Sequence, residues 1–148
     1  MTADGDARPA VLMQKPSWLI SEIWRVVHRL ITDELAATGS RGYHYRLLAA
    51  LQEFGPASQA SLGRHTAMDR SDVVASVNEL AGRGLVDRSP DPADRRRNVI
   101  TITPEGAAHL RRLEELLAGV QDELAAPLSP SERHELARML TQILDYHT

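Results

Sequence analysis

The sequence predicts a mainly α-helical domain that carries one small β-hairpin, and three observations support this fold class. Apolar residues recur at helical spacing along most of the 148 residues, whereas residues 85–103 change to the alternating pattern of β-strands. Hydrophobic residues make up 43% and charged residues 25% of the chain, which is typical of a globular domain and excludes disordered and membrane-spanning classes. The chain has no Cys, so disulfides, thiolate chemistry and Cys-bound zinc are excluded, and the cytoplasm is the expected location.

The N-terminal part is expected to form a tail followed by a long helix. Residues 1–16 carry two Asp and lack the basic and then continuously apolar order of a secretion signal, so they are predicted to be a flexible tail. Apolar residues then follow helical spacing over 17–38, with Ser17 as the expected N-cap and Gly39 as the stop.

Three shorter helices are predicted to follow in a row. The first covers 43–54 and ends at a Gly-Pro pair. The second covers 58–66, with Ser58 as its N-cap, and the third covers 69–82. The carboxylate of Asp69 is expected to cap the third helix by accepting from a backbone N–H of its first turn. The inward stripe of the third helix is expected to comprise Val73, Val77 and Leu80.

A β-hairpin and two further helices complete the chain. Alternating apolar residues predict strands over 85–89 and 99–103, joined by a long tip that is rich in Arg. Thr103 is a good N-cap for the next helix, which Pro127 ends. A capping box that starts at Ser129 opens the last helix.

Two short helices, a third helix and an Arg-rich hairpin in this order are the layout of a winged helix-turn-helix, which residues 43–103 are predicted to form. The helix at 69–82 would enter the major groove of B-DNA, and the hairpin, or wing, would reach the adjacent minor groove, whose negative potential attracts Arg. The helix residues expected to face base edges are Arg70, Ser71, Asp72, Val74, Ala75 and Asn78. The wing residues expected to bind DNA are Arg88, Asp94, Arg95, Arg96 and Arg97.

The distribution of charge supports this interpretation, although the net charge of −3 by itself argues against a nucleic-acid partner. Residues 41–103 contain nine Arg and seven acidic residues, so the acidic excess lies in the two flanks. The Arg run of the wing could also be a solvated hairpin tip, but its place after a recognition helix favours contact with phosphate. We therefore expect the middle of the chain, and not its ends, to meet DNA.

Three motifs carry a resemblance to a known family. They are Asp69-Arg70-Ser71, the run from Gly84 to Arg97, and the segment from Ile102 to Gly106. Together with the order of a long helix, a winged motif and two C-terminal helices, they resemble the MarR family of bacterial transcription regulators. The resemblance implies a repressor that works as a homodimer. It also implies that Arg96 enters the minor groove while Asp94 holds the wing against the recognition-helix region.

The apolar helices outside the winged motif are interpreted as a dimer interface. The segments 17–38 and 104–148 carry more apolar surface than a small winged motif can cover, so the surplus is expected to pack against a second copy. A two-fold dimer would place two recognition helices about 34 Å apart on one face of DNA, and a pseudo-palindromic operator follows from that symmetry.

The resemblance to the MarR family also implies a small, often aromatic or phenolic, anionic effector that releases the operator. The candidate effector residues, expected where the dimer helices meet the winged lobe, are Trp18, Trp24, His28, Tyr43, His44 and Arg46. Arg, imidazole and aromatic side chains could together hold a carboxylate or a phenolate. The alternative for the two Trp side chains is a place in the core or the interface, and for His28 it is a structural role.

Two other classes of protein have to be weighed against a DNA-binding regulator. An enzyme is not expected, because the sequence lacks the phosphate-loop, zinc-protease and serine-hydrolase motifs. No catalytic residue, cofactor or metal site is expected either, since the His residues show no ligand spacing with carboxylates. A winged-helix module that binds protein and not DNA is the alternative, and the net charge and the few polar residues on the recognition helix favour it.

Overall fold

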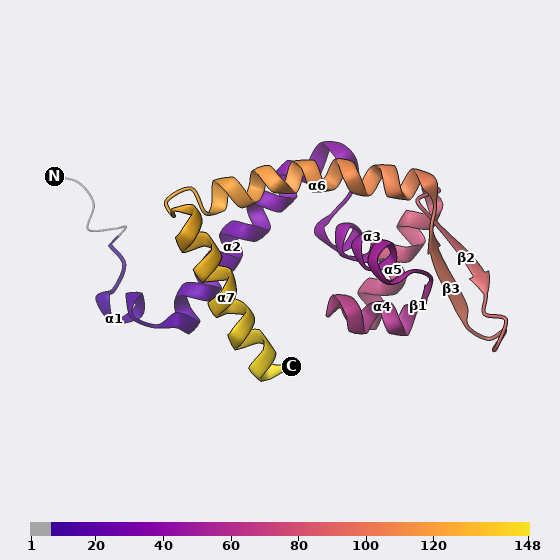
Figure 1. Cartoon of the computed structure of the whole chain (residues 1–148), viewed down its shortest axis with the longest axis horizontal. Coiled ribbons are helices and arrows are strands. Elements are labelled where there is room, and N and C mark those ends of the chain that lie inside the picture. Colours follow the sequence, from indigo (N-terminus) through magenta and orange to yellow (C-terminus); the bar gives the residue numbers. More distant parts are fainter. Residues whose placement is uncertain (1–6) are drawn as a thin grey trace. The chain divides into compact units, whose positions relative to one another are not determined.

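The computed structural model describes residues 7–148 and confirms a mainly helical fold with a small sheet (Figure 1). The helices are α1 (Ala10–Met13), α2 (Pro16–Leu35), α3 (Gly42–Phe54), α4 (Gln59–Thr66), α5 (Arg70–Gly82), α6 (Pro104–Leu124) and α7 (Pro130–His147). The strands are β1 (Ala57–Ser58), β2 (Val86–Pro90) and β3 (Asn98–Ile102). A 3-10 turn, Ala36–Thr38, follows α2 and ends at Gly39 in the left-handed conformation, as the predicted stop requires.

The chain forms two compact units. The winged unit comprises residues 31–117, and the terminal unit comprises the described residues up to 30 together with residues 118–148. These divisions differ from the boundaries at 38 and 103 expected from the sequence. The difference arises because the end of α2 and the first part of α6 belong to the winged unit, where Leu35 and Leu113 are fully buried.

The segment predicted as a flexible tail contains a short helix. Ala10–Met13 form one helical turn, which the sequence analysis did not predict. Residues 1–6 of the predicted tail lie outside the described residues. Among the described helices, none combines the length and the apolar character needed to cross a membrane.

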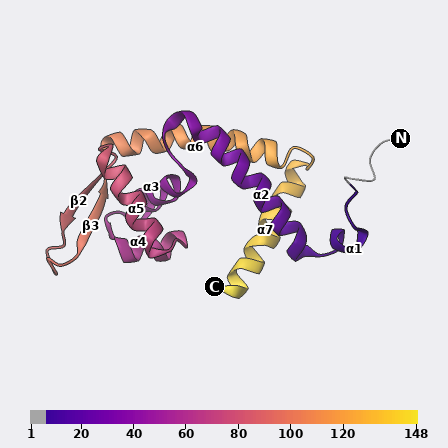
Figure 2. The same ribbon diagram turned by 180° about the vertical axis from the view of Figure 1, so that it is seen from behind.

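The winged unit contains a three-stranded antiparallel sheet in the order β1-β3-β2. Strands β2 and β3 are the predicted hairpin, shifted by one residue, and they extend beyond helices α3, α4 and α5 in both ribbon views (Figures 1 and 2). The sequence does not predict β1, because two residues are too few to show an alternating pattern. Ala57 of β1 pairs with Ile100 of β3, which places Ile100 in the middle of the sheet.

Side-chain caps fix the start of two helices as predicted. The Ser58 hydroxyl accepts from the Ser61 backbone N–H at 3.1 Å at the start of α4. At α7, Ser129 accepts from the Glu132 backbone N–H, and the Glu132 carboxylate accepts in return from the Ser129 N–H. Both caps satisfy N–H groups that the first turn of a helix leaves without a partner.

Two other predicted caps need correction. Ser17 is not an N-cap, because α2 begins one residue earlier, at Pro16, whose fixed φ and missing N–H suit the first position of a helix. Asp69 does occupy the N-cap position of α5, but its side chain makes no capping hydrogen bond.

The start of α6 is tied to the segment that leads from α5 into β2. The Thr103 hydroxyl accepts from the Gly106 N–H at 3.0 Å and donates to the Gly84 carbonyl oxygen at 2.7 Å. Gly106 packs directly against the backbone of Leu85, so no side chain fits at that position. Thr103 is therefore both the predicted N-cap and an anchor for the wing.

The core of the winged unit lies between its helices and the sheet. Its side chains are mostly apolar and come from helices α2 to α6 and from strands β2 and β3. The largest fully or almost fully buried apolar ones are Leu35, Leu47, Leu48, Leu51, Leu62, Val73, Val77, Leu80, Val86, Ile100 and Leu113. The predicted inward stripe of α5 is thus confirmed, and burial of this stripe fixes which face of α5 points outward.

Candidate nucleic-acid interface

The outward face of α5 forms a shallow concave surface. The residues that line it are Asp69, Arg70, Ser71, Val74, Ala75 and Asn78. Five of the six residues predicted to face base edges are in this set. The sixth, Asp72, is half-buried and is not part of the lining. Its carboxylate lies in the first turn of α5, where its negative charge interacts favourably with the positive end of the helix dipole.

The wing contacts this helix through one hydrogen bond. Arg88 of β2 donates from Nη2 to Oδ1 of Asn78 on α5, at 2.7 Å. Both residues are predicted DNA contacts, and the structure brings them together. The sequence gives no signal for this pairing, because it depends on how the hairpin packs against the helix.

The tip of the wing is organised by Asp94. Its Oδ1 accepts from the backbone N–H of Arg96 at 3.1 Å and from Nε of Arg96 at 3.2 Å, and its Oδ2 lies 3.8 Å from Nε of Arg97. The hydrogen bonds from Arg96 lower the pKa of the Asp94 carboxyl, which keeps it charged. The Arg96 side chain is 91% exposed, so its guanidinium remains accessible to a ligand.

This geometry corrects one role that the family resemblance implies. Asp94 was expected to hold the wing against the recognition-helix region, but its hydrogen bonds and ion pairs all lie within the tip itself. The hydrogen bond between wing and helix comes from Arg88 instead. Asp94 therefore shapes the turn that presents Arg96 and Arg97.

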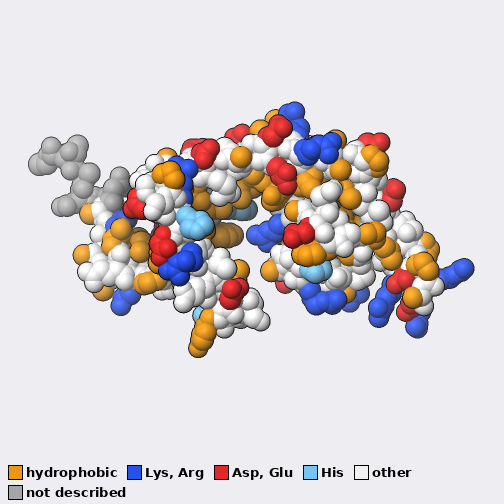
Figure 3. All heavy atoms as spheres, in the orientation of Figure 1, with side chains coloured by type: hydrophobic (Ala, Val, Ile, Leu, Met, Phe, Trp, Pro, Cys, Tyr) orange, Lys and Arg blue, Asp and Glu red, His pale blue; other side chains and the backbone are white. Residues whose placement is uncertain are grey.

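A groove of about 700 Å³ lies between the start of α4, the start of α5 and the wing tip. Four guanidinium-bearing residues line it, namely Arg64, Arg70, Arg96 and Arg97. No Asp or Glu is among its lining residues. In Figure 3 the basic side chains gather at the hairpin tip and along the adjacent lower edge of the winged unit.

Two parts of this groove are not predicted by the sequence. Arg64 lies on α4, one helix before α5, and the residues around Ser58 lie at the N-terminus of α4. The cap at Ser58 is a signal that could have indicated the second part, because an N-terminus presents free N–H groups and a partial positive charge. The place of Arg64 depends on the packing of α4 beside the wing and leaves no local signal.

Behind α5, a buried histidine holds the helix to the start of α3. His44 is 2% exposed, and its Nδ1 accepts from the Arg41 backbone N–H at 3.0 Å. Its Nε2 therefore carries the proton and donates to Oε2 of Glu79 on α5, at 2.6 Å. Arg41 donates from Nη2 to both oxygens of the same carboxylate, at 3.0 and 2.8 Å.

The same contacts set the protonation of the pair. Burial lowers the pKa of His44 and outweighs the hydrogen bond and charge of Glu79, which act to raise it. For Glu79, desolvation is opposed by the hydrogen bond from His44 and the charge of Arg41, and the pKa of the carboxyl is lowered. A neutral His44 that donates to an ionised Glu79 is the consistent state.

This contact corrects the assignment of His44 as an effector residue. Both ring nitrogens of His44 have protein partners, so the buried ring has no nitrogen left for a ligand. His44 instead links the start of α3 to α5 through Glu79.

Arg83, the C-cap residue of α5, also fastens this end of the helix to the segment before α3. It donates from Nη2 to the Thr38 carbonyl oxygen at 2.9 Å, and from Nη1 to the Gly39 carbonyl oxygen at 3.1 Å and the Ser40 hydroxyl at 3.0 Å. The Ser40 hydroxyl in turn lies 2.7 Å from Nε2 of His109. Burial and then the charge of Arg83 lower the pKa of His109, so its neutral Nε2 can accept from Ser40.

The remaining effector candidates lie in different units. On α2 in the terminal unit, the rings of Trp24 and His28 stack at 5.3 Å, and Trp24 is 62% exposed. Trp18, on the same helix, is half-buried. On α3 in the winged unit, the Arg46 guanidinium lies 5.7 Å from the centre of the Tyr43 ring. Their role in effector binding stays a prediction.

Over 7–148, no three His, Asp or Glu side chains lie together as a metal ion would require.

Comparisons with known proteins point to one family. A model described as the MarR family matches residues 38–97, which make up most of the winged unit. The HTH-type transcriptional repressor NicR of Pseudomonas putida is 35% identical over 98 residues, which are 66% of this chain. The chain spans 62% of the length of this curated relative.

Solved structures extend the likeness to nearly the whole chain. A probable transcriptional regulator from Pseudomonas aeruginosa is 30% identical, with a TM-score of 0.82 over 89% of this chain and 98% of that one. The PcaV transcriptional regulator from Streptomyces coelicolor, solved in complex with its natural ligand, is 25% identical. Its TM-score is 0.82, over 96% of this chain and 100% of that one.

Proposed function

The chain belongs to the MarR family, and from this premise we propose that it is a transcriptional repressor that binds a pseudo-palindromic DNA operator as a homodimer and is released by a small anionic ligand. The observation that carries the DNA-binding part is the convergence of four Arg residues on one groove beside the exposed face of α5.

The groove suits the phosphate backbone of a duplex. Arg64 and Arg70 come from two helices and Arg96 and Arg97 from the wing, and no carboxylate lines the groove to repel phosphate. Guanidinium groups bind phosphate oxygens through two parallel N–H donors. With a strand of the duplex held here, the concave face of α5 would lie in the major groove and the wing tip in the adjacent minor groove.

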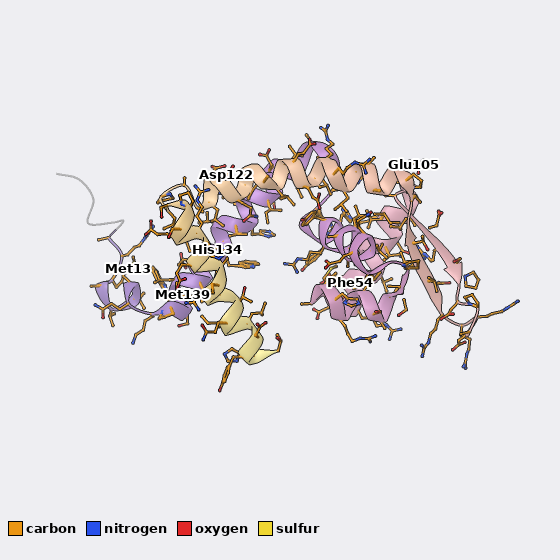
Figure 4. All side chains as sticks on the ribbon, in the orientation of Figure 1. Met13, Phe54, Glu105, Asp122, His134 and Met139 are labelled. Carbon is orange, nitrogen blue, oxygen red and sulfur yellow. The ribbon has the colours of Figure 1, made fainter. Side chains whose placement is uncertain are left out.

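A second copy of the chain would cover the apolar surface of the terminal unit. The exposed large apolar side chains of its helices include Met13, Ile20, Ile23, Trp24, Leu136, Met139, Leu140, Ile143 and Leu144. No residue of α7, the helix that carries Met139 in Figure 4, is buried, although its exposed apolar side chains recur at helical spacing. Apolar surface of this extent is typical of an interface, and two-fold pairing would give the operator its symmetry.

The proposed effector is a small aromatic anion such as a phenolic acid. To release the operator, the effector must bind more tightly to a conformation of the protein that binds the operator weakly. The PcaV transcriptional regulator, which has this fold, has been solved in complex with its natural ligand. This likeness supports our proposal that the present chain responds to a ligand as well. Operator release and thermal shift measured against a broad panel of phenolic acids test this part, and no response to any of them would contradict it.

The DNA-binding part is tested by titrating salt against binding to duplexes from the DNA upstream of the gene. Log affinity should fall steeply with log salt concentration, because each phosphate contact releases counterions. Arg96→Ala should weaken binding and reduce the slope by about 1. Arg112→Ala removes the same charge from α6, outside the groove, and serves as the control with an unchanged slope.

The alternative, a winged module that binds protein only, predicts a different result. A flat salt dependence, or equal binding by the wild type and Arg96→Ala, would favour it and would remove the wing from the mechanism.

A further inference from the structure

The hydrogen bond between wing and recognition helix changes what the helix can read. Arg88 donates to the amide oxygen of Asn78 at 2.7 Å, and Asn78 lies on the concave surface together with Ser71, Val74 and Ala75. Four of the six lining residues of this surface carry polar side chains, namely Asp69, Arg70, Ser71 and Asn78. The state of the Asn78 amide therefore contributes to any base recognition by this surface.

The sheet register places Arg88 where it can reach the helix. Arg88 pairs with Ile100 of β3, and directly opposed residues of an antiparallel pair project from the same face of a sheet. Ile100 is fully buried, so this face of the sheet is the one turned to the helices. Asn78 follows Val77, whose burial fixes the rotation of α5. Both partners thus have anchored backbones, which lowers the entropy cost of the hydrogen bond.

The chemistry of the two groups fixes the orientation of the amide. A guanidinium has five N–H donors and no acceptor, so only the oxygen of an Asn amide can face it. Oδ1 of Asn78 therefore accepts from Arg88 with one of its two lone pairs and has a guanidinium beside it, while the two hydrogens on Nδ2 remain free to donate to a base. The other donors of Arg88 lie beside them, so the pair together presents donors.

A free Asn and an Asn with a committed oxygen read different bases. A free Asn side chain binds adenine with two hydrogen bonds, donating to N7 and accepting from the N6 amino group. A guanidinium bound at the Asn oxygen brings a positive charge and further N–H donors, so it disfavours the approach of the N6 amino group to the remaining lone pair. Guanine presents acceptors at both N7 and O6, so it suits a group that only donates.

We propose that Arg88 is a specificity-determining residue that converts Asn78 into a donor, so that this position of the recognition helix selects guanine over adenine. This inference rests on the proposed DNA binding and adds the base that one site on α5 reads. Arg88 acts here by positioning Asn78, in addition to any contact that it makes with phosphate.

The test is a competition assay with operator duplexes that carry guanine or adenine at each position in turn. For the wild type, one position should favour guanine by roughly 5- to 100-fold, the range given by the loss of one well-placed base contact. Arg88→Met keeps the unbranched stem but removes the donor, and it should reverse the preference at that position toward adenine. Asn78→Ala should abolish the preference there.

The control for lost charge is Arg95→Met, which removes one Arg from the wing tip. It should weaken binding to all duplexes about equally and leave the base preference unchanged, since a phosphate contact carries no sequence information. Arg88→Met with the same preference as the wild type would overturn the inference while DNA binding stands. No change of preference in Asn78→Ala would also overturn it. Failure of the wild type to bind any duplex would overturn both the inference and the proposed function.

Discussion

Replacing Glu79 with Ala should destabilise the winged unit by removing the partner of a buried histidine. Nε2–H of His44 donates to Glu79 at 2.6 Å, and Nδ1 is already occupied by the Arg41 N–H, so the ring cannot turn to another partner. A buried donor without a partner costs about 1–3 kcal/mol. The ion pair of Glu79 with Arg41 is exposed and adds at most about 1 kcal/mol.

We therefore expect Glu79→Ala to lower the free energy of unfolding by about 2–3 kcal/mol. For a chain of this length, that loss lowers Tm by about 5–10 °C. Thermal melts followed by circular dichroism, together with urea unfolding, measure both quantities on the same protein.

The matched variant is Glu79→Gln, whose amide oxygen can still accept from His44. It loses only the charge that pairs with Arg41, so its expected loss is below about 1 kcal/mol. If Glu79→Ala melts at the wild-type temperature, the buried hydrogen bond does not support the fold as described. If Gln is as damaging as Ala, the charge and not the hydrogen bond is the stabilising feature.

Three further predictions concern packing, pH and association. Gly106→Ala places a Cβ against a backbone carbonyl oxygen and should prevent folding or lower Tm severely. Gly119→Ala meets no atom within 4 Å and should leave Tm unchanged or slightly raised. Equal melting temperatures for the two variants would contradict this prediction. Burial lowers the pKa values of His44 and His109 below 6.5, so the unfolded state binds more protons, and the free energy of unfolding should fall as the pH decreases from about 7.5 to 5.5. A stability that rises over this interval would count against neutral buried histidines. Leu140→Glu, at a position 44% exposed, should yield a monomer with unchanged helix content in light scattering and circular dichroism, and a persistent dimer would place the interface elsewhere.

Features that depend on neighbouring residues could be predicted from the sequence. The caps at Ser58, Thr103 and Ser129 join residues only three positions apart, so their chemistry is visible in the chain itself. The inward stripe of α5 follows from the 3.6-residue period in the same way. The concave surface on α5 could thus be predicted almost completely.

Features that depend on the packing of distant segments could not. Three features arise only when the hairpin folds back onto the helices. They are strand β1, the place of Arg64 beside the wing tip and the hydrogen bond from Arg88 to Asn78. For Asp94, the sequence resemblance implied a long-range contact, but the structure gives a local one, because the carboxylate is two residues from Arg96 and caps the turn.

For His44, two features of the sequence pointed to different roles, a ligand site and a buried position in a helix. Its neighbours Tyr43 and Arg46 suggested a site for an aromatic anion. Its spacing from Leu47 and Leu51 is also that of an inward helical face, and this periodicity predicts burial. The structure follows the periodicity, and the start of α3 supplies the partner for the buried ring.

The most direct measurement of paired recognition helices on DNA is a hydroxyl-radical footprint on a duplex that the protein binds. We predict two protected segments related by two-fold symmetry, about 10 base pairs apart on one face of the duplex, with flanking minor-groove protection that Arg96→Ala removes. A single protected segment, or protection with no such spacing, would contradict this arrangement.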